Sequence, residues 1–262
     1  MGERLQICDG VGGDGKGLEF LFETSSTKQY NIGQRIALTN GGVFRYAYAL
    51  TAIARNCVAG AGQVAAGHRG NLTLGSSATA SAGGNTGDFE VRVQCSATAV
   101  VRDEYAGGQY IVSSQSDNLG STQVCYIRSH PAAVASATLT LTLENPLLWP
   151  VDTRCKGNLV LNPFQNVKAM AGTANGFPVG VTTTTVAATK YCWLQTWGPS
   201  AIVQNAAGTV IVGAPVVAGS GTGGVVNSVT AANLLHYPVV GVMGQTAGAV
   251  NQLQPVFITI MP

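Results

Sequence analysis

Residues 136–145 read SATLTLTLEN, and this stretch decides the expected fold. Leu139, Leu141 and Leu143 alternate with threonines, so in an extended chain the leucines lie on one face and the threonines on the other. A strand with one apolar and one polar face is typical of an antiparallel sheet, because buried parallel strands read as continuous apolar runs. The stretch therefore predicts a half-buried strand of an antiparallel sheet.

The same alternation recurs along the chain. Residues 88–95 (DFEVRVQC) alternate with period 2, and residues 34–50 contain two extended runs around Asn40-Gly41-Gly42, which indicates a hairpin. Further strands, separated by Gly, Pro and Asn, are expected within residues 208–217 (GTVIVGAPVV), 237–243 (YPVVGVM) and 255–261 (PVFITIM). Residues 48–66 could hold one short helix, but two glycines would break it, and NLLHY near residue 233 could form one turn.

Composition favours the same fold class. The 262 residues include 34 glycines, and only 10% are charged, against roughly 25% in a typical soluble domain. Leu, Lys and Glu are scarce, whereas Val, Thr, Ala, Gly and Ser dominate. We expect an all-β protein of antiparallel β-sandwich or β-barrel-like sheets with long loops and under about 15% helix. So weakly charged a surface also favours assembly with other subunits.

The charges are unevenly distributed. The net charge is +2, and all twelve acidic residues lie at or before Asp152. Four basic side chains are spread over the last 110 residues, too sparsely for a nucleic-acid groove. This distribution suggests three parts: a Gly-rich N-terminal arm (1–30), a β domain (31–150) and a second β section (151–262). A Ser- and Gly-rich stretch at 74–88 is expected to be an outward-facing loop.

Compartment and cofactors follow from what the sequence lacks. It has no apolar run of membrane-spanning length and no secretory signal, so we expect synthesis and assembly in a cytoplasm with no membrane partner. The six cysteines are at least 30 residues apart, which excludes close metal-ligand pairs such as C-x2-C. We interpret most of them as small buried hydrophobic residues and expect no cofactor or metal.

The stretch DGVGGDGKG at residues 9–17 resembles a phosphate loop only in part. Gly17 stands where a phosphate loop has Ser or Thr, and the following LEFLFETSS is too short and too strand-like for the required helix. Asp9 and Asp14 suggest a calcium turn, but the further carboxylates of an EF-hand loop are missing. We interpret the stretch as a flexible arm that orders on a neighbouring subunit, with Gly12, Gly13 and Gly15 as candidate contacts.

No catalytic group is apparent from the sequence. The three histidines lie outside metal-binding patterns and are expected to be ordinary surface or turn residues, and no G-x-S-x-G elbow is present. Asp103 and Glu104 are adjacent, so on a strand they would point to opposite faces and could not flank one glycosidic bond. We predict a protein that is not an enzyme.

Residues 190–203 (KYCWLQTWGPSAIV) are the most distinctive segment. Trp193 and Trp197 are four residues apart, so in a regular strand they share a face with Gln195 between them. The pair is either core or an anchor between subunits, since Trp is enriched at the energetic centres of interfaces. Gly198 and Pro199 are expected to end the strand, and Trp193, Trp197 and Pro199 are candidate interaction residues.

Several strings together resemble virion structural proteins of tailed bacteriophages. The most specific is YCWLQTWGP (191–199), and the resemblance covers most of the chain from about residue 30. The other strings are FRYAYA, EYAGGQYIV, LTLENPL, NPFQNVKAM, GFPVGV, GTVIVGAPVVAG and QPVFITI. The resemblance implies a non-enzymatic capsid decoration or cement protein and supplies no catalytic residue.

The expected function follows from the resemblance. The protein would sit on the capsid surface as a homotrimer or dimer, bind the major capsid protein, and stabilise the assembled lattice by mass action and avidity. One alternative is a tail or head-fibre module that binds a host receptor or glycan, with tyrosines such as Tyr105 and Tyr110 as exposed platforms. A hydrolase is a third alternative, which the missing acid–base pair disfavours.

Overall fold

The computed structural model describes residues 6–8, 18–62, 72–73, 83–95, 97–113, 122–151, 155–170, 177–204, 212–219, 226–228, 238–245 and 252–261. The chain forms two sheets in which nearly all neighbouring strands are antiparallel, and one of the sheets is a curled half-barrel. The helical element of the described part is a single 3-10 turn, η1 (Leu18–Phe22). The expected all-β fold is therefore confirmed.

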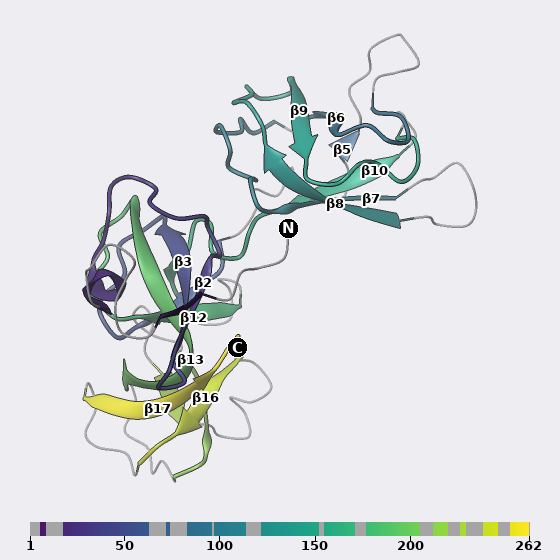
Figure 1. Cartoon of the computed structure of the whole chain (residues 1–262). Coiled ribbons are helices and arrows are strands. Elements are labelled where there is room, and N and C mark those ends of the chain that lie inside the picture. Colours follow the sequence, from purple (N-terminus) through teal and green to yellow (C-terminus); the bar gives the residue numbers. More distant parts are fainter. Residues whose placement is uncertain are drawn as a thin grey trace. The chain divides into compact units, whose positions relative to one another are not determined.

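The chain divides into two compact units (Figure 1). Unit 1 comprises residues 1–62 and 163–262, and unit 2 is the continuous segment 63–162. This division differs from the expected boundaries at residues 30 and 150, which were drawn from charge and composition. Strand pairing produces the difference, because residues 35–60 pair with strands from the last 100 residues of the chain.

Unit 1 contains an 11-stranded sheet. Its main path has the order β1-β2-β3-β13-β17-β16-β14-β15, and β12, β4 and β11 branch from β13. The strands are β1 (Gln6–Cys8), β2 (Arg35–Leu38), β3 (Val43–Ala49), β4 (Val58–Gly60), β11 (Lys168–Ala169), β12 (Pro178–Thr182), β13 (Lys190–Val203), β14 (Pro215–Ala218), β15 (Val226–Ser228), β16 (Val239–Met243) and β17 (Leu253–Thr259). The predicted later strands correspond to β14, β16 and β17.

The long strand β13 connects the two halves of this sheet (Figure 1). Its first half pairs with β3, and its second half, from Trp197 to Val203, pairs with β17. Pairing with β3 undergoes a register shift between Gln195 and Trp197, and Trp197 pairs with both Val43 and Thr259. The expectation that Gly198 and Pro199 end the strand is wrong, because Pro199 pairs with Phe257 and the strand continues to Val203.

The predicted hairpin around Asn40 joins β2 to β3. The Leu38 N–H donates to the Gly42 carbonyl at 2.8 Å, and the Gly41 N–H donates to the Leu38 carbonyl at 3.0 Å. Gly41 has a φ of 84°, a left-handed conformation that glycine adopts without steric cost. The left-handed conformation required at position 41 thus explains why a glycine follows Asn40 in the sequence.

Unit 2 contains a six-stranded sheet in the order β5-β10-β7-β8-β9-β6. The strands are β5 (Leu72–Thr73), β6 (Glu90–Gln94), β7 (Gln109–Ser113), β8 (Thr122–Ser129), β9 (Thr138–Leu143) and β10 (Lys156–Val160). The predicted inner face of β9 is confirmed, because Leu139, Leu141 and Leu143 are fully buried. They pack in one apolar core whose members all lie between Val91 and Leu161.

The helix considered within residues 48–66 is not formed in the described part of that segment, where β3 ends and β4 follows. The possible turn near residue 233 lies outside the described residues. So does most of the 74–88 loop; within its described part, Gly84 forms an antiparallel bridge with Val151, whereas residues 85–87 are exposed.

Residues 18–30, the end of the predicted arm, pack on the chain's own sheet. Leu21 of η1 is buried in a cluster with Tyr46 and Trp193. The Thr183 hydroxyl donates to the Leu21 carbonyl at 2.9 Å, and Ser25 and Tyr191 exchange two backbone hydrogen bonds. This segment therefore forms one wall of a pocket in unit 1.

Candidate functional site

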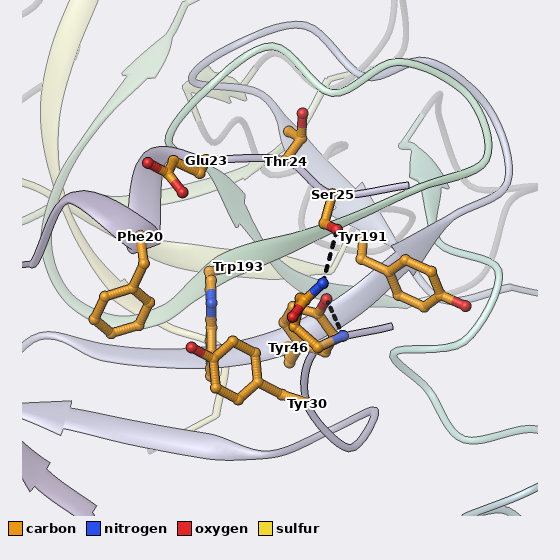
Figure 2. A pocket seen from close by; sticks show the side chains of 9 residues that line it. Phe20, Glu23, Thr24, Ser25, Tyr30, Tyr46, Tyr191 and Trp193 are labelled. Atoms are coloured by element: carbon orange, nitrogen blue, oxygen red, sulfur yellow. Dashed lines mark hydrogen bonds between the residues drawn. The ribbon is translucent and has the colours of Figure 1, made fainter. Parts of the chain in front are cut away.

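The pocket measures about 350 Å³ and lies where η1 and the segment after it cross one face of β3 and β13 (Figure 2). Five aromatic side chains line it, namely Phe20, Tyr30, Tyr46, Tyr191 and Trp193. Glu23, Thr24, Ser25 and Gln29 supply the polar part of the lining. A concave site that combines aromatic side chains with polar groups can hold a small molecule.

Strand alternation places these aromatic residues together. Tyr46 and Tyr48 of β3 are two residues apart, as are Tyr191 and Trp193 of β13, so each pair occupies one face of its strand. The register pairs Trp193 with Tyr46 and Tyr191 with Tyr48. Four aromatic rings from distant parts of the chain thus share one face of the sheet.

The rings pack closely around Trp193. Its ring centroid lies 5.1 Å from those of Tyr30 and Tyr46 and 5.9 Å from that of Phe20. Tyr46 and Tyr191 stack almost parallel, with centroids 5.8 Å apart and an interplanar angle of 5°. These tilted and offset arrangements are the favourable ones for aromatic quadrupoles. Trp193 and Tyr46 are buried, whereas Phe20, Tyr30 and Tyr191 are only half-buried and remain reachable from the pocket.

Hydrogen bonds hold the polar side of the pocket (Figure 2). The backbone N–H of Gln29 donates to the Tyr46 hydroxyl at 3.2 Å. The Gln29 side-chain amide donates to the Thr27 hydroxyl at 2.7 Å and to the Ser25 hydroxyl at 3.4 Å. These bonds tie the segment after η1 to the strand that carries Tyr46, so the wall and the floor of the pocket are positioned together.

The pocket offers hydrogen-bond donors as well as apolar rings. Burial raises the pKa of Tyr46 and of Tyr191, so both phenols keep their protons at neutral pH. The Tyr46 oxygen accepts a hydrogen bond from Gln29, which leaves its own proton for another acceptor. Trp193 is 2% exposed, and its indole N–H has no acceptor among the described residues.

The sequence singled out Trp193 and Trp197 together, but the structure places them in different clusters. Trp193 belongs to the pocket, whereas the Trp197 ring packs edge-to-face on Phe257 with centroids 5.7 Å apart. Gln195 is buried, and its side-chain amide donates to the carbonyls of Trp197 and Pro199 at 3.2 and 2.8 Å. Pro199 is exposed. Gln195 therefore stabilises the backbone of β13 just after its register shift. It does not lie between two tryptophan rings on one surface.

Two other groups of predicted contact residues have different outcomes. Gly12, Gly13 and Gly15 lie outside the described residues. Tyr105 and Tyr110, suggested as exposed platforms of a receptor-binding module, are 1% and 0% exposed, so that suggestion is wrong for both. They point into the core of unit 2, because they occupy the apolar positions of their segments.

His130, expected at the surface or in a turn, is buried and structural. Its Nε2 accepts the Tyr105 backbone N–H at 2.9 Å, so the ring proton resides on Nδ1, which lies 2.8 Å from the Pro131 carbonyl. Asp103 accepts the His130 backbone N–H at 3.0 Å, and Glu104 accepts that of Val101 at 3.1 Å. These side chains fix a turn.

The five cysteines whose side chains the structure describes are buried, as the sequence predicted, and none of them forms a disulfide with another of the five. They are Cys57, Cys95, Cys125, Cys155 and Cys192. Among the described residues, no group of three or more His, Cys, Asp and Glu side chains could hold a metal ion. No helix in the described part is long and apolar enough to cross a membrane.

A second surface feature lies on the outward face of the unit 2 sheet. Val124 and Tyr126 of β8 are 42% and 52% exposed, although both lie within a regular strand. The register places Ile111 of β7 opposite Val124, and Gln109 lies between Tyr126 on one side and Val160 of β10 on the other. We call Ile111, Val124, Tyr126 and Val160 the outer apolar face.

The pocket could have been found from the aromatic alternation in FRYAYA and in YCW. Neither the 18–30 wall nor the register that brings the two strings together can be read from spacing alone. Comparison of the chain with protein-family models, with curated proteins and with solved structures finds no match.

Proposed function

We propose that this chain is a non-enzymatic structural protein of a tailed-phage virion, which decorates the capsid and stabilises the shell through many copies. The resemblance of YCWLQTWGP and the other strings supports the class of protein. The observation that carries the proposal is the outer apolar face, which exposes large aliphatic and aromatic side chains on a regular sheet.

An exposed apolar face on a sheet is suited to contact with another subunit. Burying apolar surface contributes about 25 cal/mol per Å², and an aromatic residue at the centre of such a face often dominates the affinity. Tyr126, 52% exposed, is the most exposed member of the outer apolar face, and Val124 lies two residues away on the same side of β8. We propose the major capsid protein as the partner of this face.

Charge contributes little to this contact. The two ion pairs that the structure gives for unit 2, Arg102–Asp103 and Arg128–Glu144, are exposed, and exposed pairs contribute about 0–1 kcal/mol. Repetition can compensate for a modest contact, since a protein that binds only the assembled lattice stabilises it by mass action, and a multimer adds avidity.

The test mixes the purified protein with capsids of the encoding phage that lack it. We expect co-sedimentation in many copies per capsid and greater resistance of the capsids to heat. Tyr126→Lys should weaken binding by about tenfold, because it places a charge in an apolar contact.

Thr138→Lys is the matched control, since it adds the same charge at an exposed polar position of β9. It should bind like the unchanged protein. Absence of any capsid binding would refute the proposal. If both variants lost capsid binding equally, the contact would not lie on the outer apolar face.

A further inference from the structure

We propose that the aromatic pocket of unit 1 binds a neutral saccharide, one pyranose ring or the end of a short glycan. This inference goes beyond a shell-stabilising role. It concerns a different unit and different residues from the outer apolar face, so either proposal can hold without the other.

The first argument is the chemistry of the walls. A pyranose has apolar faces of C–H groups and an edge of hydroxyls, so it needs aromatic surface and hydrogen-bonding groups in one concave site. Phe20, Tyr30 and Tyr191 present half-buried rings around the buried floor of Tyr46 and Trp193. A purely apolar ligand would use only these rings and leave the polar groups of the pocket unpaired.

The second argument is the hydrogen-bond donor at the floor of the pocket. Trp193 is 2% exposed yet lines the pocket, and no described residue accepts a hydrogen bond from its indole N–H. Because Trp193 lines the pocket, its N–H is open to a ligand there, and an oxygen of that ligand could accept a hydrogen bond from it. The neighbouring Tyr46 hydroxyl accepts the Gln29 backbone N–H and so keeps its one proton to donate to a ligand.

The third argument is charge. Glu23 carries the only ionised side chain among the described residues that line the pocket. Anionic ligands are bound by Arg, Lys or clustered N–H donors, and a carboxylate at the rim repels them. Glu23 can instead accept hydrogen bonds from sugar hydroxyls, which favours a neutral ligand over a phosphorylated, sulfated or carboxylated one.

The fourth argument is size. A volume of about 350 Å³ is at the lower end of the range for small-molecule sites, roughly 300–1,000 Å³. It suits one or two sugar rings, with the remainder of a longer glycan outside.

The test uses the full chain and saturation-transfer NMR with methyl glycosides of glucose, galactose, mannose and N-acetylglucosamine as separate probes. Two further probes are N-acetylneuraminic acid, which is an anionic sugar, and 4-methylphenol, which is an aromatic ligand without a sugar ring. We expect saturation of the ring C–H protons of at least one neutral glycoside, with a Kd of about 1 mM or tighter.

Two variants locate the site. Trp193→Phe keeps a ring at the floor but removes the N–H donor, and should weaken binding about three- to tenfold. Tyr30→Ala removes one wall and should weaken it at least as much. Tyr126→Ala is the control, because it removes an exposed tyrosine from unit 2 and should leave sugar binding unchanged. A two-dimensional NMR spectrum of each variant verifies that it is folded.

Each other outcome overturns the proposal. If none of the four neutral glycosides shows saturation transfer, a saccharide site is excluded. If only 4-methylphenol or only the anionic sugar binds, the pocket belongs to another ligand class. Binding that survives both pocket variants places the site elsewhere. No capsid is present in these measurements, so their failure is distinguishable from failure of the capsid proposal.

Discussion

Cys192 shows what burial does to a single residue. It lies on β13 with 1% of its surface exposed, packed among Ala47, Val179 and Leu194. Burial raises the pKa of its thiol to about 12, because the thiolate would lose its hydration there. Burial likewise raises the pKa of Cys57 and Cys125. These cysteines are therefore apolar packing residues that resist ionisation.

The pKa of Cys192 predicts how stability depends on pH. The unfolded thiol loses its proton near pH 9, whereas the folded thiol keeps its proton up to about pH 12. Between these values the folded state binds more protons, so stability is full below about pH 9 and falls as the pH rises. Cys192→Ala should reduce the slope of unfolding free energy against pH by up to roughly 1 kcal/mol per pH unit.

Urea unfolding at several pH values between about 8 and 12 measures this slope. Val179→Ala serves as the control, since it removes apolar atoms from the same cluster without removing a titrating group, and should keep the original slope. If Cys192→Ala and the unchanged protein lose stability in parallel, the thiol does not titrate as its burial implies.

At the scale of elements, the long strand β13 with its register shift organises unit 1. A register shift lies between Gln195 and Trp197, and Trp197 pairs with both Val43 of β3 and Thr259 of β17. The Gln195 amide donates to the carbonyls of Trp197 and Pro199 just after the shift. Gly198 follows the shift with a φ of 93°. A Cβ there would lie 2.8 Å from the Gly41 carbonyl oxygen, so the β2–β3 hairpin packs directly on this backbone.

Gly198→Ala should therefore destabilise unit 1 for two reasons. A left-handed φ costs a residue with a Cβ about 1–2 kcal/mol, and the contact with Gly41 adds a clash that backbone cannot easily relieve. Gly213→Ala separates the two effects, because Gly213 has a φ of 80° but no atom within 4 Å of an added Cβ. Urea unfolding should show a clearly larger loss for Gly198→Ala, and equal losses would contradict the close approach.

At the scale of the whole molecule, unit 2 is an insertion into unit 1. It is one continuous segment with its own apolar core, whereas unit 1 is built from both ends of the chain. The two connections lie side by side, since a Cβ on Gly62 would be 2.7 Å from the backbone oxygens of Gln165 and Asn166. Neighbouring ends are what allow one domain to be inserted into another.

Residues 63–162 expressed alone should fold, because the cluster that stabilises unit 2 draws on no residue of unit 1. The complementary variant joins Gly62 to Pro163 through a few glycines and should retain unit 1. Cooperative unfolding and dispersed amide signals in NMR measure both outcomes. A fragment 63–162 that stays unfolded under conditions where the full chain is folded would show that the insertion depends on its host.

Strand patterns were predictable where burial repeats with period 2. Val91 and Val93 of β6, and the leucines of β9, could be assigned to the core from the sequence. Phe89, which extends the same alternation, lies just before β6 and is half exposed, because the alternation of faces applies only within the strand. The burial of Tyr105 and Tyr110 was not predicted, because composition does not tell which tyrosines face a core.

The sequence alone determined the all-β fold class, the turn at Asn40 and the burial of the five described cysteines, because alternation and turn chemistry act between near neighbours in the chain. Only the tertiary structure decided the insertion of residues 63–162, the continuation of β13 through Pro199 and the pocket around Trp193. These features depend on pairing between strands far apart in the sequence, such as Pro199 with Phe257 and Trp193 with Tyr46, and local spacing carries no information about which distant strands pair.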